Sequence, residues 1–222
     1  MEMHPEQIPP EYYRFERYVD EVRWATYWHQ ISAVLDFRPK TVLEVGVGAG
    51  VVSSYLSSLG IEVTTLDVNP SLGADMTGSV LDLKALLGDQ TFDVILCARV
   101  AHHLPLDDFN SLLCNLEGAC RVGVVLTVPF DDLRFYMALR RTAGDYHYFS
   151  IGLPLALKRI GRIGRRLTAY ERLWKVTRFG KTGVRKTRAR IQETFVIRDS
   201  YRIPQDKAHL LYSLSPRVKA SV

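Results

Sequence analysis

The sequence has few cysteines and no long apolar run. Its three cysteines, Cys97, Cys114 and Cys120, are odd in number and lie in apolar surroundings, which indicates buried free thiols rather than a disulfide framework. No grouping of cysteine and histidine has zinc-site spacing, so no metal is expected. No apolar run reaches the roughly 18 residues of a membrane span, and the first ten residues have neither a basic leader nor an apolar core. A cytoplasmic protein is therefore expected.

Acidic residues are scarce in one stretch of the chain. Between residues 158 and 190 there are thirteen Lys and Arg but a single acid, Glu171, which gives a local charge of +12. Because the whole chain carries +5, the remainder carries −7. The apolar content of 47% and charged content of 24% are ordinary for a soluble globular protein, and 222 residues suit one α/β domain. Charge is thus segregated along the chain.

The stretch TVLEVGVGAG, residues 41–50, contains three alternating glycines. The apolar residues before them are typical of a strand buried on both faces, and apolar residues at helical spacing follow from Val51 to Leu59. A strand, glycine loop and helix in this order place backbone N–H groups at the mouth of a parallel sheet, with no Cβ to hold a ligand away. The next strand, residues 62–66, is followed by Asp67, which can accept hydrogen bonds from both hydroxyls of a ribose.

The glycine spacing separates two classes of cofactor. Nicotinamide and flavin enzymes use G-x-G-x-x-G, whereas this chain has G-x-G-x-G with an acid, Glu44, before it. The pattern E-x-G-x-G-x-G resembles motif I of the class I S-adenosylmethionine-dependent methyltransferases. Residues 78–83 resemble the adenine-side segment of that family, residues 92–97 its fourth strand, and His103-Leu104-Pro105 the ending that follows. The resemblance covers roughly residues 22–150 and is closest to the small type 11 group. A nicotinamide oxidoreductase is the alternative that the spacing disfavours.

The resemblance implies an α/β fold, a Rossmann-like, seven-stranded, mostly parallel doubly wound sheet. The residue pattern of the chain adds an N-terminal helix and a basic helical insertion before the last two strands. Residues 1–222 then form a single methyltransferase domain. Its expected parts are a mobile lead-in (1–10), a helical cap (11–38), a cofactor-binding core (39–150), a basic amphipathic insertion (151–190) and a closing β-hairpin (191–215).

The resemblance also implies a cofactor, S-adenosylmethionine, with S-adenosylhomocysteine as the product. Ser79 stands where Asp is commoner in the family, and Asp82 is an alternative for the same adenine contact. The expected cofactor-binding residues are Glu44, Gly46, Val47, Gly48, Gly50, Asp67, Val68, Ser79, Val80 and Cys97.

Four residues are candidates on the acceptor side. In similar methyltransferases a helix before the first strand often covers the cofactor, so Tyr27 or Trp28 could face the substrate; alternatively, these rings anchor the helix on the sheet. His103 either supports the loop near the methyl donor or contacts substrate. His147 could take a proton from a hydroxyl acceptor, or it could pack among the neighbouring tyrosines. An acceptor that is already nucleophilic needs no base.

The basic segment 158–190 follows the region of resemblance. Its first part, to residue 174, has the pattern of a basic amphipathic helix, and residues 178–190 are expected to form a mobile loop. An anionic membrane surface, a nucleic acid, or a phosphorylated substrate such as a lipid-linked sugar would fit as partner. The alternative is a solvated face over a stripe packed on its own domain.

The expected function is methyl transfer to a small-molecule or lipid/phosphosugar-type acceptor by direct in-line attack. One alternative is a non-catalytic methyltransferase-like protein that binds a nucleic acid or membrane through residues 158–190. A second alternative is an RNA methyltransferase. A lipid-linked acceptor would place this cytoplasmic protein at the inner membrane surface.

Overall fold

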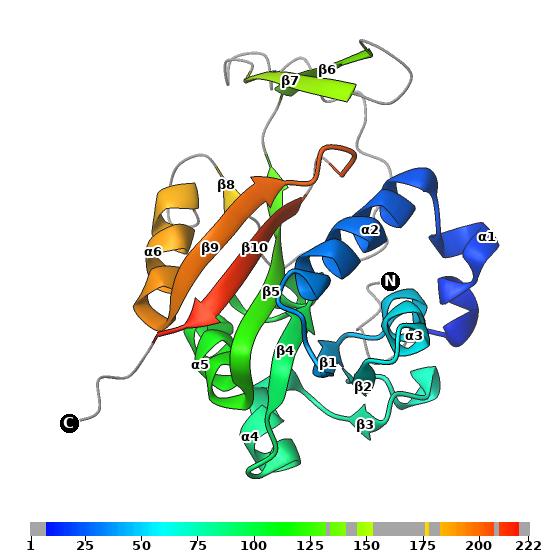
Figure 1. Ribbon diagram of the computed structural model, residues 1–222, viewed down its shortest axis with the longest axis vertical. Helices are drawn as coiled ribbons and strands as arrows, with labels where there is room; N and C mark the ends of the chain where they lie inside the picture. Colours follow the sequence, from blue (N-terminus) through cyan, green and yellow to red (C-terminus); the bar gives the residue numbers. More distant parts are fainter. Residues whose placement is uncertain are drawn as a thin grey trace.

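The computed structural model describes residues 8–131, 134–140, 146–152, 176–177, 183–206 and 209–217 (Figure 1). The helices are η2 (Pro10–Tyr13), α1 (Phe15–Tyr18), α2 (Glu21–Leu35), α3 (Val51–Ser58), η3 (Pro70–Leu72), η4 (Val80–Asp82), α4 (Leu83–Leu87), η5 (Ala101–His103), η6 (Leu106–Asp108), α5 (Phe109–Ala119) and α6 (Val184–Thr194). The strands are β1 (Thr41–Val45), β2 (Glu62–Asp67), β3 (Met76–Thr77), β4 (Phe92–Cys97), β5 (Cys120–Asp131), β6 (Arg134–Arg140), β7 (Tyr146–Gly152), β8 (Val176–Thr177), β9 (Phe195–Arg202) and β10 (His209–Pro216).

The main sheet has the strand order β3-β2-β1-β4-β5-β10-β9, and β8 pairs with the end of β5. Strands β3, β2, β1, β4 and β5 run parallel, whereas β10 is antiparallel to both of its neighbours. The expectation of a doubly wound, mostly parallel sheet with a closing antiparallel hairpin is therefore confirmed. The carboxyl ends of the parallel strands meet at one edge, which is where such sheets bind ligands.

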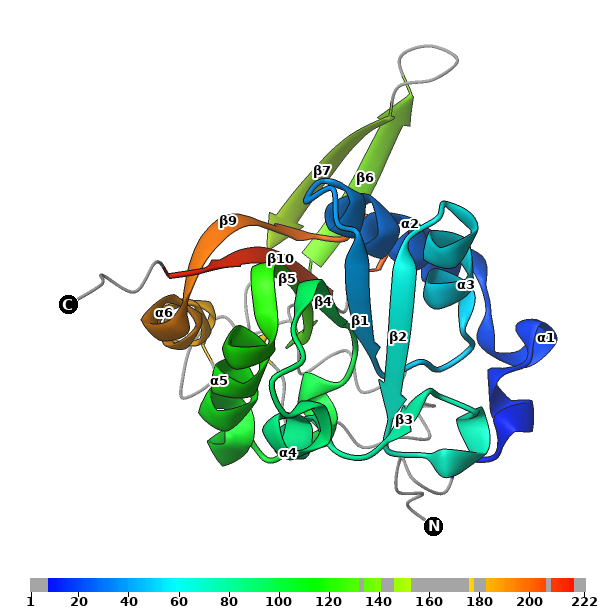
Figure 2. The same ribbon diagram turned by 60° about the horizontal axis from the view of Figure 1, so that its bottom comes forward.

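Two apolar cores cover the two faces of the sheet, because successive side chains of a strand point to opposite faces. In β1, Val42 packs on the side of α2 and α3, while Leu43 packs on the side of α4, α5 and α6. Figures 1 and 2 show these two helical layers with the sheet between them. The alternation decides on which face of the sheet each strand residue packs. Strand β1 is therefore packed on both faces just before the glycine loop.

The helical cap expected over residues 11–38 consists of three helices, η2, α1 and α2. Asp20 caps α2, since its Oδ1 accepts the backbone N–H of Arg23 at 2.7 Å. Ile8 lies within the predicted mobile lead-in, yet it is only 4% exposed, and its carbonyl accepts Nδ2 of Asn69 at 2.7 Å. The described end of the lead-in, at Ile8, is thus anchored on the loop after β2.

The structure corrects the expectation of a mobile loop for residues 184–190, whereas residues 178–182 lie outside its described part. Residues 184–194 form α6, and the closing strand expected from Ile191 begins at Phe195 instead. Val184, Thr187 and Ile191 recur at helical spacing and pack toward the core, Ile191 with no exposed surface. Because Thr187 is not apolar, the spacing of apolar residues alone does not predict this buried side of the helix.

The hairpin of β6 and β7 has no counterpart in the sequence expectations. It crosses the expected boundary at residues 150 and 151, and it projects from the main sheet (Figure 2). The predicted basic amphipathic helix, to residue 174, lies outside the described residues.

Candidate functional site

A cleft of about 690 Å³ lies where β1, β2 and β4 end. Its walls come from the glycine loop, the N-terminal helices, the loop after β4 and the first residue of β10. Ten of the candidate site residues line it: Tyr27, Glu44, Gly46, Val47, Gly48, Asp67, Val68, Ser79, Val80 and His103. The structure therefore brings together most of the residues that the sequence nominated from separate segments.

The glycine loop adopts a backbone that favours glycine at each of its three positions. The φ angles of Gly46, Gly48 and Gly50 are +85°, +52° and +67°, all in the left-handed region. A Cβ on Gly46 would lie 2.5 Å from Cγ2 of Val100, and one on Gly48 would lie 3.6 Å from Cε1 of Tyr13. The loop thus forms a narrow cradle, and Gly50 serves it as the N-cap of α3.

Glu44, at the end of β1, is a buried acid with an available oxygen. Burial raises its pKa to about 7, although the hydroxyl and backbone N–H of Ser53 donate to the carboxyl and oppose the shift. Its Oε2 has no hydrogen-bond partner among the described residues. A buried carboxyl oxygen without a partner costs free energy that a cationic or hydrogen-bond-donating ligand would recover.

Asp67, at the end of β2, faces the glycine loop. Burial raises its pKa, while the backbone N–H groups of Asn69, Val47, Gly48 and Val68 donate to the carboxylate and lower it. The Asn69 bond is 2.9 Å long. These bonds hold the carboxylate in the lining of the cleft.

The adenine-side candidates divide between the cleft and the core. Ser79 lines the cleft and caps η4 by accepting the backbone N–H of Leu81 at 3.1 Å. Asp82, the alternative for its role, is exposed in η4 and is not part of the cleft lining. Cys97 is fully buried in the core, and burial raises its pKa to about 12. The cleft wall after β4 is made by Ala98, Arg99 and Val100 instead.

A group of tyrosines, which sequence reasoning did not single out, covers the glycine loop. Tyr12, Tyr13 and Tyr18 meet edge to face, with ring centroids 4.8–5.4 Å apart. The guanidinium of Arg23 lies 3.6 Å from the centroid of Tyr18. Arg23 has no carboxylate partner for its side chain in the part of the chain that the structure describes. The cleft therefore holds a guanidinium that is available to an anionic group.

The two aromatic candidates of α2 face different ways. Tyr27 lines the cleft, and its pKa is raised by burial, while the charges of Arg23 and Arg99 oppose the shift. Trp28 is 62% exposed and lies outside the cleft lining. Because adjacent helix positions differ by about 100°, only one of the two can face the ligand, and it is Tyr27.

A charged junction closes the cleft beside β10. Asp206, which is 4% exposed, forms an ion pair with Arg99, and its Oδ2 lies 2.7 Å from Nδ1 of His209. Arg99 and His209 both line the cleft. Arg99 also has a φ of +61°, and its backbone N–H donates to Oγ1 of Thr127 at 2.8 Å. Local sequence carries no signal for this junction apart from the turn that contains Asp206.

The two remaining candidates are histidines in different parts of the fold. His103 lines the cleft, and its ring centroid lies 4.2 Å from that of His102, which is buried. His147 is part of β7, where its backbone pairs with Leu139. The side chain of His147 lies outside the described residues, so its proposed role as a base stays a prediction.

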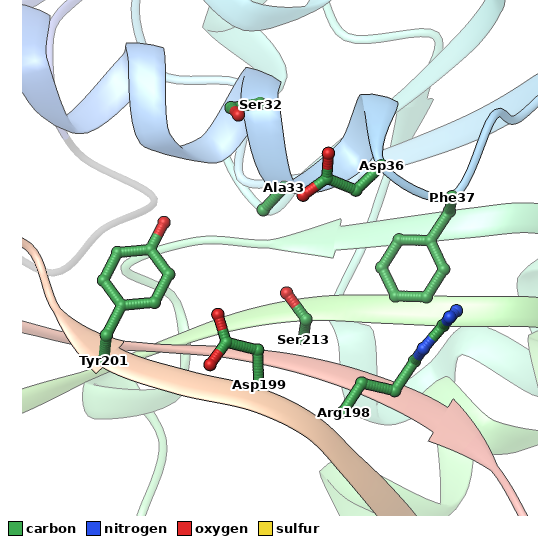
Figure 3. A pocket seen from close by; sticks show the side chains of 8 residues that line it. All are labelled: Ser32, Ala33, Asp36, Phe37, Arg198, Asp199, Tyr201 and Ser213. Atoms are coloured by element: carbon green, nitrogen blue, oxygen red, sulfur yellow. The ribbon is translucent and has the colours of Figure 1, made fainter.

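A second, smaller pocket of about 190 Å³ lies between α2 and the β9–β10 hairpin (Figure 3). The carboxylates of Asp36 and Asp199 are directed into it, and the guanidinium of Arg198 lies 5.1 Å from the centroid of Phe37. None of the candidate site residues from the sequence lines this pocket. The larger cleft is therefore the candidate functional site.

Two kinds of feature are absent from the described residues. They contain no cluster of three or more His, Cys, Asp or Glu that could hold a metal ion. They also contain no helix that is long and apolar enough to cross a membrane.

Comparison with known proteins agrees with the geometry of the cleft. Residues 43–128 match the type 11 family described as "Methyltransferase domain". A ubiquinone biosynthesis O-methyltransferase of Xanthomonas oryzae pv. oryzae is 31% identical over 88 residues, 34% of this chain and 37% of that protein. A tRNA 5-carboxymethoxyuridine methyltransferase of Escherichia coli is 26% identical over 203 residues, 82% of this chain and 77% of that protein. The match thus spans well under half the length of the Xanthomonas relative.

Solved structures share the fold. A magnesium protoporphyrin IX methyltransferase of Synechocystis has a TM-score of 0.57 at 14% identity, covering 88% of this chain and 85% of its own. An N-methyltransferase of Bradyrhizobium japonicum has a TM-score of 0.55 at 13% identity, covering 89% of each chain. Both of those structures contain S-adenosylhomocysteine. Residues 43–128 thus resemble a type 11 methyltransferase domain, and the chain has the Rossmann-like fold of the class I S-adenosylmethionine-dependent methyltransferases.

Proposed function

We propose that the protein transfers a methyl group from S-adenosylmethionine to an acceptor by direct in-line attack. The observation that carries the proposal is the buried Glu44 oxygen beside a glycine cradle that a Cβ would fill. S-adenosylmethionine supplies a methyl group already activated on a sulfonium. The protein's task is then to hold, align and shield the reactants, and alignment alone can contribute roughly 7–11 kcal/mol.

Complementary charges in the cleft suit the two ends of this cofactor. Glu44 would accept its ammonium group, and Arg23, without a carboxylate partner among the described residues, would bind its carboxylate. Asp67 would accept the ribose hydroxyls. Ser79 and Val80 would lie beside the adenine. Each of these residues lines the same cleft, so one ligand can reach all of them.

The acceptor that we propose is a small molecule or a lipid/phosphosugar-type compound. Support comes from the far wall of the cleft, where Tyr27, Arg99 and His209 meet. Aromatic surface together with a guanidinium favours an acceptor with a planar or anionic part. A lipid-linked acceptor would bring the protein to the inner membrane surface. His147 is the proposed base for a hydroxyl acceptor.

Methylation of a transfer RNA nucleoside is a second candidate. It is favoured by the long alignment with the Escherichia coli protein, which covers 82% of this chain. A catalytically inactive protein that binds an anionic partner through residues 158–190 would keep the cofactor cleft but yield no methylated product.

Calorimetric titration of S-adenosylmethionine tests the proposal. Asp67→Ala should weaken binding roughly ten- to a hundredfold, because hydrogen bonds to a charged group contribute about 1.5–3 kcal/mol. Asp89→Ala removes an exposed acid from the turn after α4 and should leave the affinity unchanged. Absence of binding to the wild-type protein would overturn the proposal. Equal weakening in both variants would show that Asp67 does not contact the ligand.

A further inference from the structure

Helix α6 places its cations on the outside of the molecule. Four of its first seven residues are basic: Arg185, Lys186, Arg188 and Arg190. The first three are exposed, whereas Thr187 and Ile191 are buried on the opposite side. Figure 1 shows α6 at the β9 edge of the sheet, beside α5. The inward side therefore holds the helix in place, and the outward side carries the charge.

This charge arrangement opposes helix stability. The N-terminus of a helix carries partial positive charge and favours acids, yet the first turn of α6 contains no acid. Its one acid, Glu193, lies near the negative C-terminal end. Arg185 and Arg188 are three residues apart, and Lys186 and Arg190 are four apart, so both pairs bring like charges together on the helix surface. Cations that destabilise the helix on which they lie indicate a role other than folding, such as the binding of a partner.

The shape of the surface indicates an extended partner. These cations line neither of the two pockets described above. From Arg185 to Arg190 the helix rises about 7.5 Å, so the cations are spaced along it. A small anion needs cations that converge on one point, whereas a polyanion needs cations spaced along a convex face. The second description fits α6.

The side chains of α6 favour a nucleic acid over a lipid bilayer. A helix that binds in a membrane interface buries an apolar face among the lipids. In α6 the apolar side is already covered by the protein, and Ala189 is the only apolar residue among its exposed positions. Three of the four cations are arginines, whose planar fork binds phosphate oxygens in pairs.

We propose that the exposed face of α6 is a docking surface for the phosphate backbone of a nucleic acid, for which transfer RNA is the probe. Arg185 and Lys186 would contact phosphates directly. Arg188 is partly engaged within the protein, since its Nη1 donates to Oγ of Ser200 at 3.0 Å. The surface is separate from the cofactor cleft, so the inference does not depend on which acceptor is methylated.

The test is the binding of fluorescein-labelled bulk transfer RNA, measured by anisotropy at several salt concentrations. Arg185→Gln/Lys186→Gln removes two charges and keeps good helix formers. Lys40→Gln/Lys84→Gln removes two exposed charges before β1 and on α4, and serves as the matched control. The α6 variant should bind roughly tenfold more weakly, with a salt slope smaller by about 1.4–1.8. The control should bind like the wild-type protein.

Two further measurements keep the outcome decisive. Thermal unfolding of the α6 variant should have an equal or higher midpoint, because like-charge repulsion is removed; a lower midpoint would indicate a structural role and overturn the proposal. Co-sedimentation with phosphatidylglycerol/phosphatidylcholine vesicles tests the other partner. Loss of vesicle binding with unchanged RNA binding would assign the surface to lipid. Equal loss of RNA binding in the α6 variant and the control would show that binding depends only on net charge, and would overturn the proposal.

Discussion

Oδ2 of Asp206 lies 2.7 Å from Nδ1 of His209, and the same oxygen takes part in the ion pair with Arg99. It also accepts the hydroxyl of Thr26 at 3.3 Å. One buried carboxylate thus joins α2, the loop after β4 and the start of β10. Residues of these three segments line the cleft, so this carboxylate links three parts of its wall.

Asp206→Asn keeps the size of this side chain and removes its charge. Because the partners Arg99 and His209 would keep their places with a weaker acceptor, we expect the free energy of unfolding to fall by about 2–3 kcal/mol, less than for a fully buried pair. Urea denaturation followed by circular dichroism measures it. Glu62→Gln, at an exposed acid of β2, is the control and should change little. An unchanged midpoint for Asp206→Asn would mean that the junction contributes no net stability.

Glu44 makes the stability of the fold depend on pH. Its pKa rises from an ordinary value of 4.5 to about 7 on folding, chiefly through burial. Between these two values the folded protein holds a proton that the unfolded chain has released, so stability falls as pH rises through this window. The loss amounts to about 3 kcal/mol by pH 8. In Glu44→Gln this loss should be absent. Urea titrations from pH 4.5 to 8 give the free energy of unfolding of both proteins. If it changed with pH in the same way in the wild-type protein and in Glu44→Gln, Glu44 would not be the cause.

Alanine substitutions at two glycines with nearly equal φ angles distinguish the cost of backbone strain from the cost of filling space in the cleft. Gly46 has φ +85° and Val100 beside it, whereas Gly60 has φ +82° and no described atom within 4 Å of the point where a Cβ would lie. Gly60→Ala should cost only the strain, about 1 kcal/mol. Gly46→Ala should cost about 2–3 kcal/mol, because overpacking adds to strain, and should also abolish S-adenosylhomocysteine binding. If Gly46→Ala and Gly60→Ala lost equal stability and bound S-adenosylhomocysteine with equal affinity, Gly46 would not be part of the binding site.

Arg23 can be tested with a ligand that lacks the amino-acid end. Arg23→Gln should weaken S-adenosylhomocysteine binding roughly ten- to a hundredfold, since a charge-assisted contact is lost. Its affinity for 5′-methylthioadenosine, which has no carboxylate, should stay the same. Arg38→Gln, at an exposed arginine after α2, is the matched control. A parallel loss for both ligands would place the effect of Arg23 on the shape of the cleft instead.

Local sequence was sufficient to predict the strand, loop and helix around the cofactor. The glycines, Glu44 and Asp67 belong to contiguous segments whose composition fixes their conformation, and the parallel sheet then brings them together. The helix that carries Tyr27 was also predicted, and the family resemblance nominated Tyr27 or Trp28, but neither could decide which of the two faces inward. That choice depends on how α2 rotates against the sheet.

The other wall of the cleft could not be predicted, because it rests on long-range contacts. Arg99 and Asp206 are 107 residues apart, and nothing in either segment indicates the other. The tyrosines over the glycine loop were missed for a related reason, since Tyr12 and Tyr13 lie in the expected helical cap but reach Gly48 only through the fold of the chain. Helix α6 was mistaken for a loop because its buried stripe includes Thr187, a residue that is usually exposed.

The segment around Tyr13 and Ile8 has a consequence for the rate of turnover. Tyr13 lies over Gly48, and Ile8 is fastened to Asn69, so a ligand in the glycine cradle is enclosed by residues that precede the first strand. We expect release of S-adenosylhomocysteine to require this segment to move away from Gly48, with loss of the Asn69 bond. Product release would then limit turnover, and the expected sign is a first methyl transfer that is faster than the later ones.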